Sequence, residues 1–305
     1  MKVSIIIPTF NCGKFIKKNL NKYININEMY NLLFVDSSSS DDTLSLLRKI
    51  TDNIVIIPQS EFDHGGTRSE AALKTNADII VYLTQDALPI DISAIEKIIK
   101  VFEDETIGAA FGRQIPYENT NLFGKHLRYF NYVDKSYIRC IDDKDKYGIK
   151  AAFLSNSFAA YRRSAMDEIG WFKDGLILGE DTYAGAKLLK AGYKIAYVAD
   201  AVVYHSHSYT VWQEFKRYFD IGAFHQMEHW ILDEFGKPEG EGIKYIKSEF
   251  RFILKNKKIY FIPEFLVRNI MKYLGYKLGN IYKYLPKGLI KRLSMNSKWW
   301  DKEKV

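Results

Sequence analysis

The first hundred residues alternate short apolar runs with segments in which apolar side chains recur every three or four positions. The apolar runs begin at Val3, Leu32, Ile54 and Ile79, and a segment with helical spacing follows each of them. Short, continuous apolar runs are typical of strands that are buried on both faces, as in parallel sheets. The alternation therefore predicts an α/β fold with a doubly wound, mostly parallel sheet of the Rossmann-like type.

Beyond residue 111 the pattern loosens, and it becomes regular again near residue 164. The expected strands are 3–7, 32–35, 54–57, 79–83 and 202–204, and the expected helices are 14–23, 43–50, 69–76, 92–102, 164–169 and 182–189. Residues 243–305 have helical spacing throughout, which predicts a C-terminal helical extension on one large α/β domain.

The formal net charge of +7 is unevenly placed along the 305 residues. Residues 243–305 contain sixteen Lys or Arg and four Asp or Glu, whereas residues 1–242 contain 28 Lys or Arg and 33 Asp or Glu. A basic tail on a mildly acidic body indicates that the tail has a partner of its own. Because the basic charge is confined to the tail and no nucleic-acid-binding motif occurs, we expect no nucleic-acid partner.

The basic tail also carries an apolar stripe. Its apolar residues at helical spacing are Ile262, Phe265, Leu266, Ile270, Tyr273, Leu274, Leu278 and Ile281, with Arg268, Lys272 and Lys283 among them. Two interpretations remain open: an interfacial helix on anionic lipid, or a stripe that docks on the catalytic domain while its lysines face water. No apolar run reaches the roughly 18 residues of a spanning helix, and no export signal is recognisable. We therefore expect a cytoplasmic protein, peripheral on the inner face of the cell membrane, with Cys12 and Cys140 as free thiols.

Polar motifs follow the predicted strands at the points where the strands end. Pro8-Thr-Phe-Asn11 follows the first strand, Asp36 and a run of serines follow the second, and Thr84-Gln-Asp86 follows the fourth. Because the carboxyl ends of parallel strands meet at one edge, we expect Thr9, Asp36 and Asp86 along one crevice. Asp36 could bind a base or ribose, and Asp86 could hold Mg²⁺ or Mn²⁺ against a diphosphate. Turn and helix-capping roles are the structural alternatives.

Three further motifs carry candidate chemistry. Phe62-Asp-His-Gly-Gly-Thr-Arg68 has glycines that let the backbone approach a ligand, and its arginine offers a planar donor fork; a surface turn is the alternative. Gly179-Glu-Asp-Thr182 marks a helix start, and Tyr204-His-Ser-His207 follows it. The acids and the alternating histidines fit a general base and a metal ligand, although a helix-dipole or packing role would explain each alone. The first strand lacks Gly-x-Gly-x-x-Gly, which is evidence against a Rossmann dinucleotide site.

As a set, these motifs resemble the family 2 glycosyltransferases with the GT-A fold, in order and in spacing, over residues 1–230. The segments that resemble the bacterial rhamnosyltransferase branch are Phe62 to Arg68, Thr84 to Pro89, Gly112-Arg-Gln-Ile-Pro116, His205-Ser-His-Ser-Tyr209 and the basic tail. The branch implies transfer of L-rhamnose from dTDP-β-L-rhamnose to a lipid-linked cell-surface polysaccharide. It also implies a nucleotide-sugar-binding half (1–115), an acceptor-binding half (116–240) and a basic amphipathic tail (241–305).

The resemblance further implies an inverting, metal-dependent reaction and a role for each matching residue. The implied nucleotide-sugar-binding residues are Pro8, Thr9, Asn11, Asp36, Ser38, Arg68 and Gln85, and the implied acceptor-binding residues are Asn156, Trp171 and Glu180. Asp181 would be the catalytic base. Asp86 and His205 would hold Mg²⁺ or Mn²⁺, with His207 as second choice. Thr84 departs from the family pattern, which has a first aspartate at this position, so the metal would have fewer protein ligands.

Two other functions are compatible with the same residues. A family 2 transferase that uses a UDP-hexose would show the same motifs, because the loops that select the sugar are not identified by them. A catalytically inactive, nucleotide-binding scaffold is the alternative from another class, and its support is the threonine at position 84.

Overall fold

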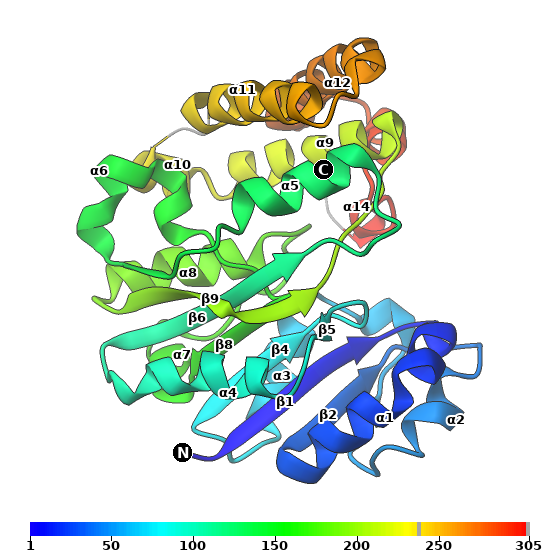
Figure 1. Cartoon of the computed structure of the whole chain (residues 1–305), viewed down its shortest axis with the longest axis vertical. Coiled ribbons are helices and arrows are strands. Elements are labelled where there is room, and N and C mark those ends of the chain that lie inside the picture. Colours follow the sequence, from blue (N-terminus) through cyan, green and yellow to red (C-terminus); the bar gives the residue numbers. More distant parts are fainter. Residues whose placement is uncertain (237–238, 303–305) are drawn as a thin grey trace.

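The computed structural model describes residues 1–236 and 239–302. The described residues form a nine-stranded sheet in the order β3-β2-β1-β4-β8-β6-β9-β5, with β7 paired to β9 (Figure 1). The strands are β1 (Val3–Thr9), β2 (Asn31–Asp36), β3 (Ile54–Ile56), β4 (Ile79–Leu83), β5 (Leu88–Pro89), β6 (Ile107–Ile115), β7 (Tyr137–Arg139), β8 (Phe158–Arg162) and β9 (Lys194–Tyr204). The predicted α/β fold is confirmed, and β3, β2, β1 and β4 are four adjacent strands that run parallel to one another.

Helices lie on both faces of the sheet and continue into a C-terminal helical layer. The helices of the first two hundred residues are α1 (Gly13–Met29), α2 (Thr43–Leu47), α3 (Gly66–Leu73), α4 (Ser93–Lys100), α5 (Leu122–Asn131), α6 (Lys144–Tyr147), α7 (Arg163–Ile169) and α8 (Glu180–Lys190). Those that follow are α9 (Val211–Met227), α10 (His229–Phe235), α11 (Glu239–Lys255), α12 (Ile262–Asn280), α13 (Lys287–Leu293) and α14 (Trp299–Lys302). The predicted helical extension is therefore present, and it consists of several separate helices.

The second half of the sheet is mixed, whereas the sequence predicts mostly parallel strands. β8 runs antiparallel between β4 and β6, whereas β6 and β9 pair in parallel. The prediction placed a strand only at 202–204, but β9 begins at Lys194, because the exposed Asp200 interrupts an otherwise buried run. β6 was not predicted, since its apolar run is broken by Gly108 and Gly112.

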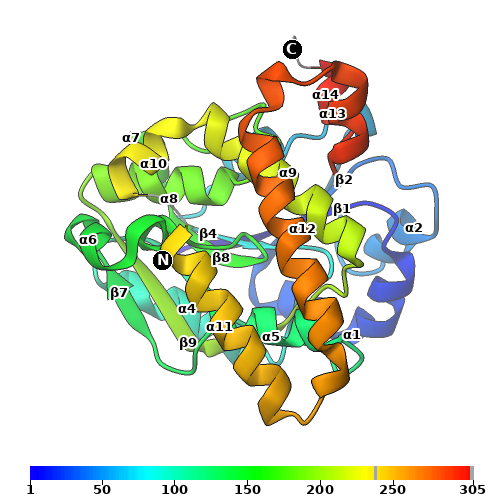
Figure 2. The ribbon, with the colours of Figure 1, turned by 90° about the horizontal axis from the view of Figure 1, so that it is seen from above.

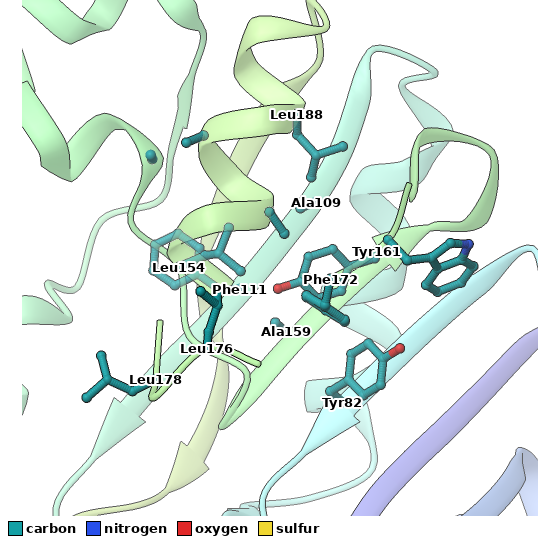
Figure 3. Close-up of a cluster of buried hydrophobic side chains, with 14 of the residues drawn as sticks. Tyr82, Ala109, Phe111, Leu154, Ala159, Tyr161, Phe172, Leu176, Leu178 and Leu188 are labelled. Carbon is teal, nitrogen blue, oxygen red and sulfur yellow. The ribbon is translucent and has the colours of Figure 1, made fainter. Parts of the chain in front are cut away.

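The two faces of the sheet bury separate hydrophobic clusters. Alternate residues of β1 point to opposite faces, so that Ile5 packs with α1, α2 and α4 while Ile6 packs with α3, α7 and α8. On the second face Tyr82, Tyr161 and Phe172 meet edge to face, with ring centroids 5.2 to 5.7 Å apart (Figure 3). Phe172 lies in the chain that leads from α7 to α8, so this packing fixes where α8 begins.

Helices α11 and α12 form a layer across α5 and α9, at the end of the molecule opposite β1 and β2 (Figure 1). α12 packs along α9, and glycines bring the two backbones close together. A Cβ at Gly279 would lie 2.0 Å from the Phe219 carbonyl oxygen, and one at Gly222 would lie 2.2 Å from the Tyr276 oxygen. Any larger residue at either position would force the two backbones apart. The close contact between α9 and α12 therefore depends on glycine at both positions.

The inner side of this helical layer is ionic. Arg268 and Lys272 of α12 are 4% and 6% exposed, and both contact the Glu214 carboxylate of α9, at 3.1 and 3.7 Å. Lys272 also lies 3.7 Å from Glu249 of α11, which is fully buried and accepts a hydrogen bond from the Tyr245 hydroxyl. Each buried charge thus has an opposite partner, as burial requires.

The outer side of the layer is apolar. The exposed apolar residues of α11 and of the turn after it are Ile243, Ile246, Phe250, Leu254, Ile259 and Tyr260, and those of α12 and its C-cap are Leu266, Val267, Ile270, Tyr273, Leu274 and Ile281. Of the predicted stripe, Phe265 is buried and Ile262 and Leu278 are partly buried. The interpretation in which the stripe docks inward and the lysines face water is therefore wrong for most of α12. Within the described ranges, no helix is long and apolar enough to cross a membrane.

Candidate active site

A cleft of about 960 Å³ opens at the carboxyl ends of β1 and β4. Its lining comes from three parts of the sequence. The lining residues are Pro8, Thr9, Phe10, Ser37, Gln59, Ser60, Phe62, Asp63, His64, Arg68, Thr84 and Gln85, then Gly175, Leu176 and Ile177, and finally Met295 to Trp299, Asp301 and Lys302. Four predicted donor-side residues therefore line one cleft, namely Pro8, Thr9, Arg68 and Gln85.

The other predicted donor-side residues, Asn11, Asp36 and Ser38, lie in or next to the loops that follow β1 and β2. Asp36 is fully buried, and its carboxylate accepts hydrogen bonds from the Thr9 hydroxyl at 3.1 Å and from the Ser39 backbone N–H at 2.8 Å. Asn11 and Ser38 both have left-handed backbone, with φ of 47° and 55°. Non-glycine residues in this region store strain and cluster at functional sites. The loops after β1 and β2 are thus held in one uncommon conformation.

Side-chain hydrogen bonds hold these two loops in place. The Asn11 amide oxygen accepts from the Ser40 backbone N–H at 2.8 Å, and the Ser38 hydroxyl donates to the Ile57 carbonyl at 2.8 Å. The Gln85 amide oxygen accepts from the Phe10 backbone N–H at 2.7 Å, which ties the end of β4 to the end of β1.

Arg68 joins the donor side of the site to the start of α8. Its guanidinium is 3.3 Å from the Glu180 carboxylate and also donates to the His64 carbonyl at 2.7 Å. The Asn156 amide donates to Glu180 at 3.1 Å and accepts from the Tyr161 hydroxyl at 2.8 Å. Burial alone would raise the pKa of Glu180, but the guanidinium keeps it below its usual range. Glu180 and Asn156, predicted on the acceptor side, thus belong to a buried polar network.

Asp181 lies next to this network on the first turn of α8. One oxygen accepts from the Thr182 backbone N–H at 2.7 Å, and the other accepts from the Asn156 backbone N–H at 3.3 Å. Burial and then the neighbouring Glu180 carboxylate raise the pKa of Asp181 to about 6. An oriented carboxylate with a pKa near neutrality is suited to accept a proton.

Asp86, His205 and His207 form a compact cluster of ligand atoms, all within 4.8 Å of one another. The His205 Nε2 atom is 3.5 Å from one Asp86 oxygen, and the His207 Nδ1 atom is 3.8 Å from the other. Burial alone would raise the pKa of Asp86, but the hydrogen bond and charge of His205 hold it well below its usual range. Burial and the neighbouring His205 lower the pKa of His207 to about 4, so its imidazole is neutral near pH 7.

Gln114 and Arg128 set the orientation of His205. The Gln114 amide oxygen lies 2.7 Å from the His205 Nδ1 atom and also accepts from the Arg128 guanidinium. Because that oxygen only accepts, Nδ1 carries a proton, and Nε2 is the ring nitrogen that faces Asp86 and would offer its lone pair to a metal ion. This arrangement is typical of metal-binding histidines. Gln114 lies in a segment that resembles the rhamnosyltransferase branch, but the sequence indicates no role for that residue and does not single out Arg128.

The histidine cluster and the candidate base are linked through adjacent residues. The Gln114 amide nitrogen donates to the Ser155 hydroxyl at 3.1 Å, and the next residue, Asn156, donates its backbone N–H to Asp181. Hydrogen bonds therefore lead from His205 through Gln114 to Ser155, and the residue bonded to Ser155, Asn156, contacts Asp181.

Trp171 lies away from the cleft lining. It is 8% exposed, packs in the core beside α7, and its indole N–H donates to the Asp167 carboxylate at 2.8 Å. Its acceptor role therefore stays a prediction.

Arg217 of α9 is an exposed residue near the site that the sequence motifs do not single out. Burial is the main cause that lowers the pKa of His64 and of His207, and the positive charge of Arg217 lowers both further.

Solved structures share this architecture over nearly the whole chain. The mannosyltransferase PcManGT from Pyrobaculum calidifontis, in complex with GDP-Man and Mn²⁺, has a TM-score of 0.63 at 14% identity and covers 93% of this chain and 88% of its own. Residues 1–349 of TarS from S. aureus give a TM-score of 0.56 at 14% identity, with 93% and 91% covered. The fold is therefore the GT-A fold of glycosyltransferases.

The sequence comparison is more specific. The model of glycosyl transferase family 2 matches residues 4–170. The O-antigen chain rhamnosyltransferase RfbN of Salmonella typhimurium is 44% identical over 99% of this chain and 96% of its own length. The O-antigen chain rhamnosyltransferase WbaN of Salmonella anatum is 42% identical, over 98% and 95%. The chain belongs to glycosyl transferase family 2 and is a glycosyltransferase, as its motifs predict.

Proposed function

We propose that this enzyme transfers L-rhamnose from dTDP-β-L-rhamnose to a lipid-linked O-antigen polysaccharide, with inversion at the anomeric carbon. The main support is the 44% identity, over 99% of the chain, to an O-antigen chain rhamnosyltransferase. The donor would occupy the cleft at the ends of β1 and β4, which is lined mainly by residues of the predicted donor half (1–115) and also by residues 175–177, 295–299, 301 and 302. The acceptor would approach from residues 116–240. No feature of the cleft favours a UDP-hexose over the proposed donor.

In this mechanism Asp181 accepts the proton of the acceptor hydroxyl while that oxygen attacks the anomeric carbon. The two backbone N–H groups of Asn156 and Thr182 orient the carboxylate for this transfer. Arg68 and the strand-end residues Thr9 and Gln85 bind the donor, and the buried Glu180 keeps the guanidinium in place. A single displacement of this kind converts a β-linked donor into an α-linked product.

The Asp86, His205 and His207 cluster fits a divalent cation. Its ligand atoms converge, and the hydrogen bond from Nδ1 of His205 to Gln114 leaves a nitrogen lone pair on the cluster side. Two imidazoles beside one carboxylate suit Mn²⁺ better than Mg²⁺, which prefers oxygen ligands. When bound, such an ion neutralises charge on the departing nucleotide diphosphate.

The donor is tested with a panel of nucleotide sugars. We expect dTDP-β-L-rhamnose to raise the thermal unfolding midpoint, in the presence of Mn²⁺, more than UDP-glucose, UDP-N-acetylglucosamine or GDP-mannose, because a ligand stabilises the state that binds it. Differential scanning fluorimetry followed by a donor-hydrolysis assay gives the measurement. A larger shift with a UDP-hexose would replace the proposed donor by the alternative one.

The catalytic base is tested with Asp181→Asn, which keeps the shape of the side chain. We expect normal folding and a loss of turnover of about 10²- to 10⁴-fold, the usual contribution of general base catalysis. Because the carboxylate is the active form and its pKa is raised to about 6, wild-type kcat/KM should be level above pH 6 and fall on acidification below it. The residual activity of the variant should lack this acidic limb. Near-wild-type turnover would remove Asp181 from the role.

The metal site is tested by direct binding. We expect Asp86→Ala to abolish the binding of Mn²⁺, measured by electron paramagnetic resonance of the free ion, and to remove the response of activity to added Mn²⁺. His229→Ala is the matched control, because His229 is exposed on α10 and pairs with Asp233 instead of joining the cluster. An unchanged Mn²⁺ titration in Asp86→Ala would exclude this cluster as the metal site.

We further propose that the outer side of α11 and α12 binds the anionic inner face of the cell membrane. Both helices lie on the same side of the molecule (Figures 1 and 2), and the apolar residues face outward because the ionic residues face inward. Exposed basic residues accompany the apolar ones on α11 and in the turn after it: Lys244, Lys247, Arg251, Lys255, Lys257 and Lys258. Each basic residue near such a surface contributes about 1 kcal/mol, which adds to the burial of apolar side chains.

Membrane binding is tested by point substitution, since removal of the tail would expose the surfaces that α12 covers. We expect Ile270→Glu/Leu274→Glu to abolish flotation with phosphatidylglycerol-containing vesicles and to leave the fold intact, because both side chains are exposed. Leu73→Glu is the control, since Leu73 is 58% exposed on α3, outside the helical layer. Equal flotation of wild type and the double variant would contradict the proposal.

A further inference from the structure

The C-terminal segment returns from the helical layer to the donor cleft. After α13 the chain turns at Ser294, and residues 295–299, together with Asp301 and Lys302, line the cleft across from Pro8 and Thr9. Figure 2 shows α13 and α14 on the side of the molecule opposite α11. One wall of the donor cleft is therefore built from the last residues that the structure describes.

This segment is fixed to the core of the protein. The Trp300 side chain is fully buried, with its ring centroid 5.1 Å from that of Tyr282 and 6.4 Å from that of Phe219. The buried Asp220 carboxylate of α9 accepts hydrogen bonds from the backbone N–H groups of Met295 and Asn296, at 3.0 and 3.1 Å. The segment is thus a constant part of the cleft wall.

The charges of the cleft point to an anionic ligand at this wall. Arg68 is offset by Glu180, and the Asp63 carboxylate accepts from the backbone N–H groups of Gly65, Gly66 and Gly175. Asp301 lines the cleft, but its carboxylate is paired, at 2.6 Å, with the Lys291 ammonium, and Lys291 is not a lining residue. By contrast, Lys298 and Lys302 have no carboxylate within ion-pairing distance in the described part of the chain, and the Lys302 ammonium donates to the Ser60 carbonyl. The uncompensated cations of the cleft therefore come from the C-terminal segment.

We propose that Lys298 and Lys302 bind the diphosphate of the nucleotide-sugar donor, so that the C-terminal segment is a component of the donor site. This inference rests on the proposed function, because it requires a nucleoside diphosphate in the cleft. Two flexible ammonium groups can follow a diphosphate from opposite ends of a short segment, and a low-dielectric wall such as Trp299 strengthens their attraction. Positive charge at this wall would also hold the diphosphate after the sugar has left.

The experiment is a calorimetric titration of the full-length protein with dTDP in the presence of Mn²⁺. We expect Lys298→Gln/Lys302→Gln to raise the dissociation constant by at least about tenfold, since two charge-assisted hydrogen bonds are lost. The dissociation constant of the wild type should also rise more steeply with NaCl than that of the variant, because salt screens the two ammonium groups. Both lysines are exposed, so the variant should keep the wild-type circular dichroism spectrum and unfolding midpoint.

The control is Lys49→Gln/Lys100→Gln, which removes the same charge from two exposed lysines outside the cleft lining. The control should bind dTDP as the wild type does. Equal weakening in both double variants, or an unchanged dissociation constant in Lys298→Gln/Lys302→Gln, would overturn the role of the segment and leave the proposed function standing. A wild-type protein that binds neither dTDP nor any other nucleotide diphosphate would instead overturn the proposed function.

Discussion

The contact between Arg68 and Glu180 connects α3 to α8 and places a charged carboxylate beside Asp181, the proposed base. Arg68 lies on α3, which the parallel half of the sheet positions, and Glu180 lies on α8, which is placed by the packing of Phe172. Burial raises the pKa of Asp181, and the neighbouring Glu180 carboxylate, whose own pKa the guanidinium lowers, raises it further, to about 6. A buried charge without its partner costs several kcal/mol, so the ion pair that holds α3 to α8 also keeps Glu180 charged beside the proposed base.

The sequence predicts the parallel part of the fold because its strands are short, apolar and separated by helical spacing. It also predicts that Thr9, Asp36 and Asp86 lie along one crevice, since strand ends meet at one edge of the sheet. Of these, Thr9 lines the cleft, and Asp36 accepts a hydrogen bond from Thr9 beside it, whereas Asp86 belongs to the histidine cluster. It does not predict β6 or the length of β9, because their apolar runs are interrupted by Gly112 and Asp200. The antiparallel insertion of β8 depends on long-range pairing, which leaves no local signal.

The same distinction explains which site residues were recognised. Asp86 and His205 belong to motifs with distinctive spacing, and the structure brings them together with His207. Gln114 and Arg128 act on His205 from β6 and α5, at sequence separations of 91 and 77 residues, so no local pattern connects them. Lys298 is still harder to recognise, because a lysine in a basic tail looks like one more solvated charge until the chain is seen to return to the cleft.

The helical layer shows why the direction of an amphipathic helix cannot be read from its pattern alone. The spacing of Ile270, Tyr273 and Leu274 defines an apolar side, but only the acidic partners on α9 and α11 decide that Arg268 and Lys272 point inward. Once those ion pairs form, the apolar side must face outward, where a lipid surface would stabilise it. The chain then runs from this layer through α13 into the wall of the donor cleft. The surface proposed to bind the membrane and the wall proposed to bind the donor are therefore parts of one continuous segment, anchored to α9 by close helix contact and by Asp220. For an enzyme with a lipid-linked acceptor, this continuity would fix the height of the donor site above the bilayer.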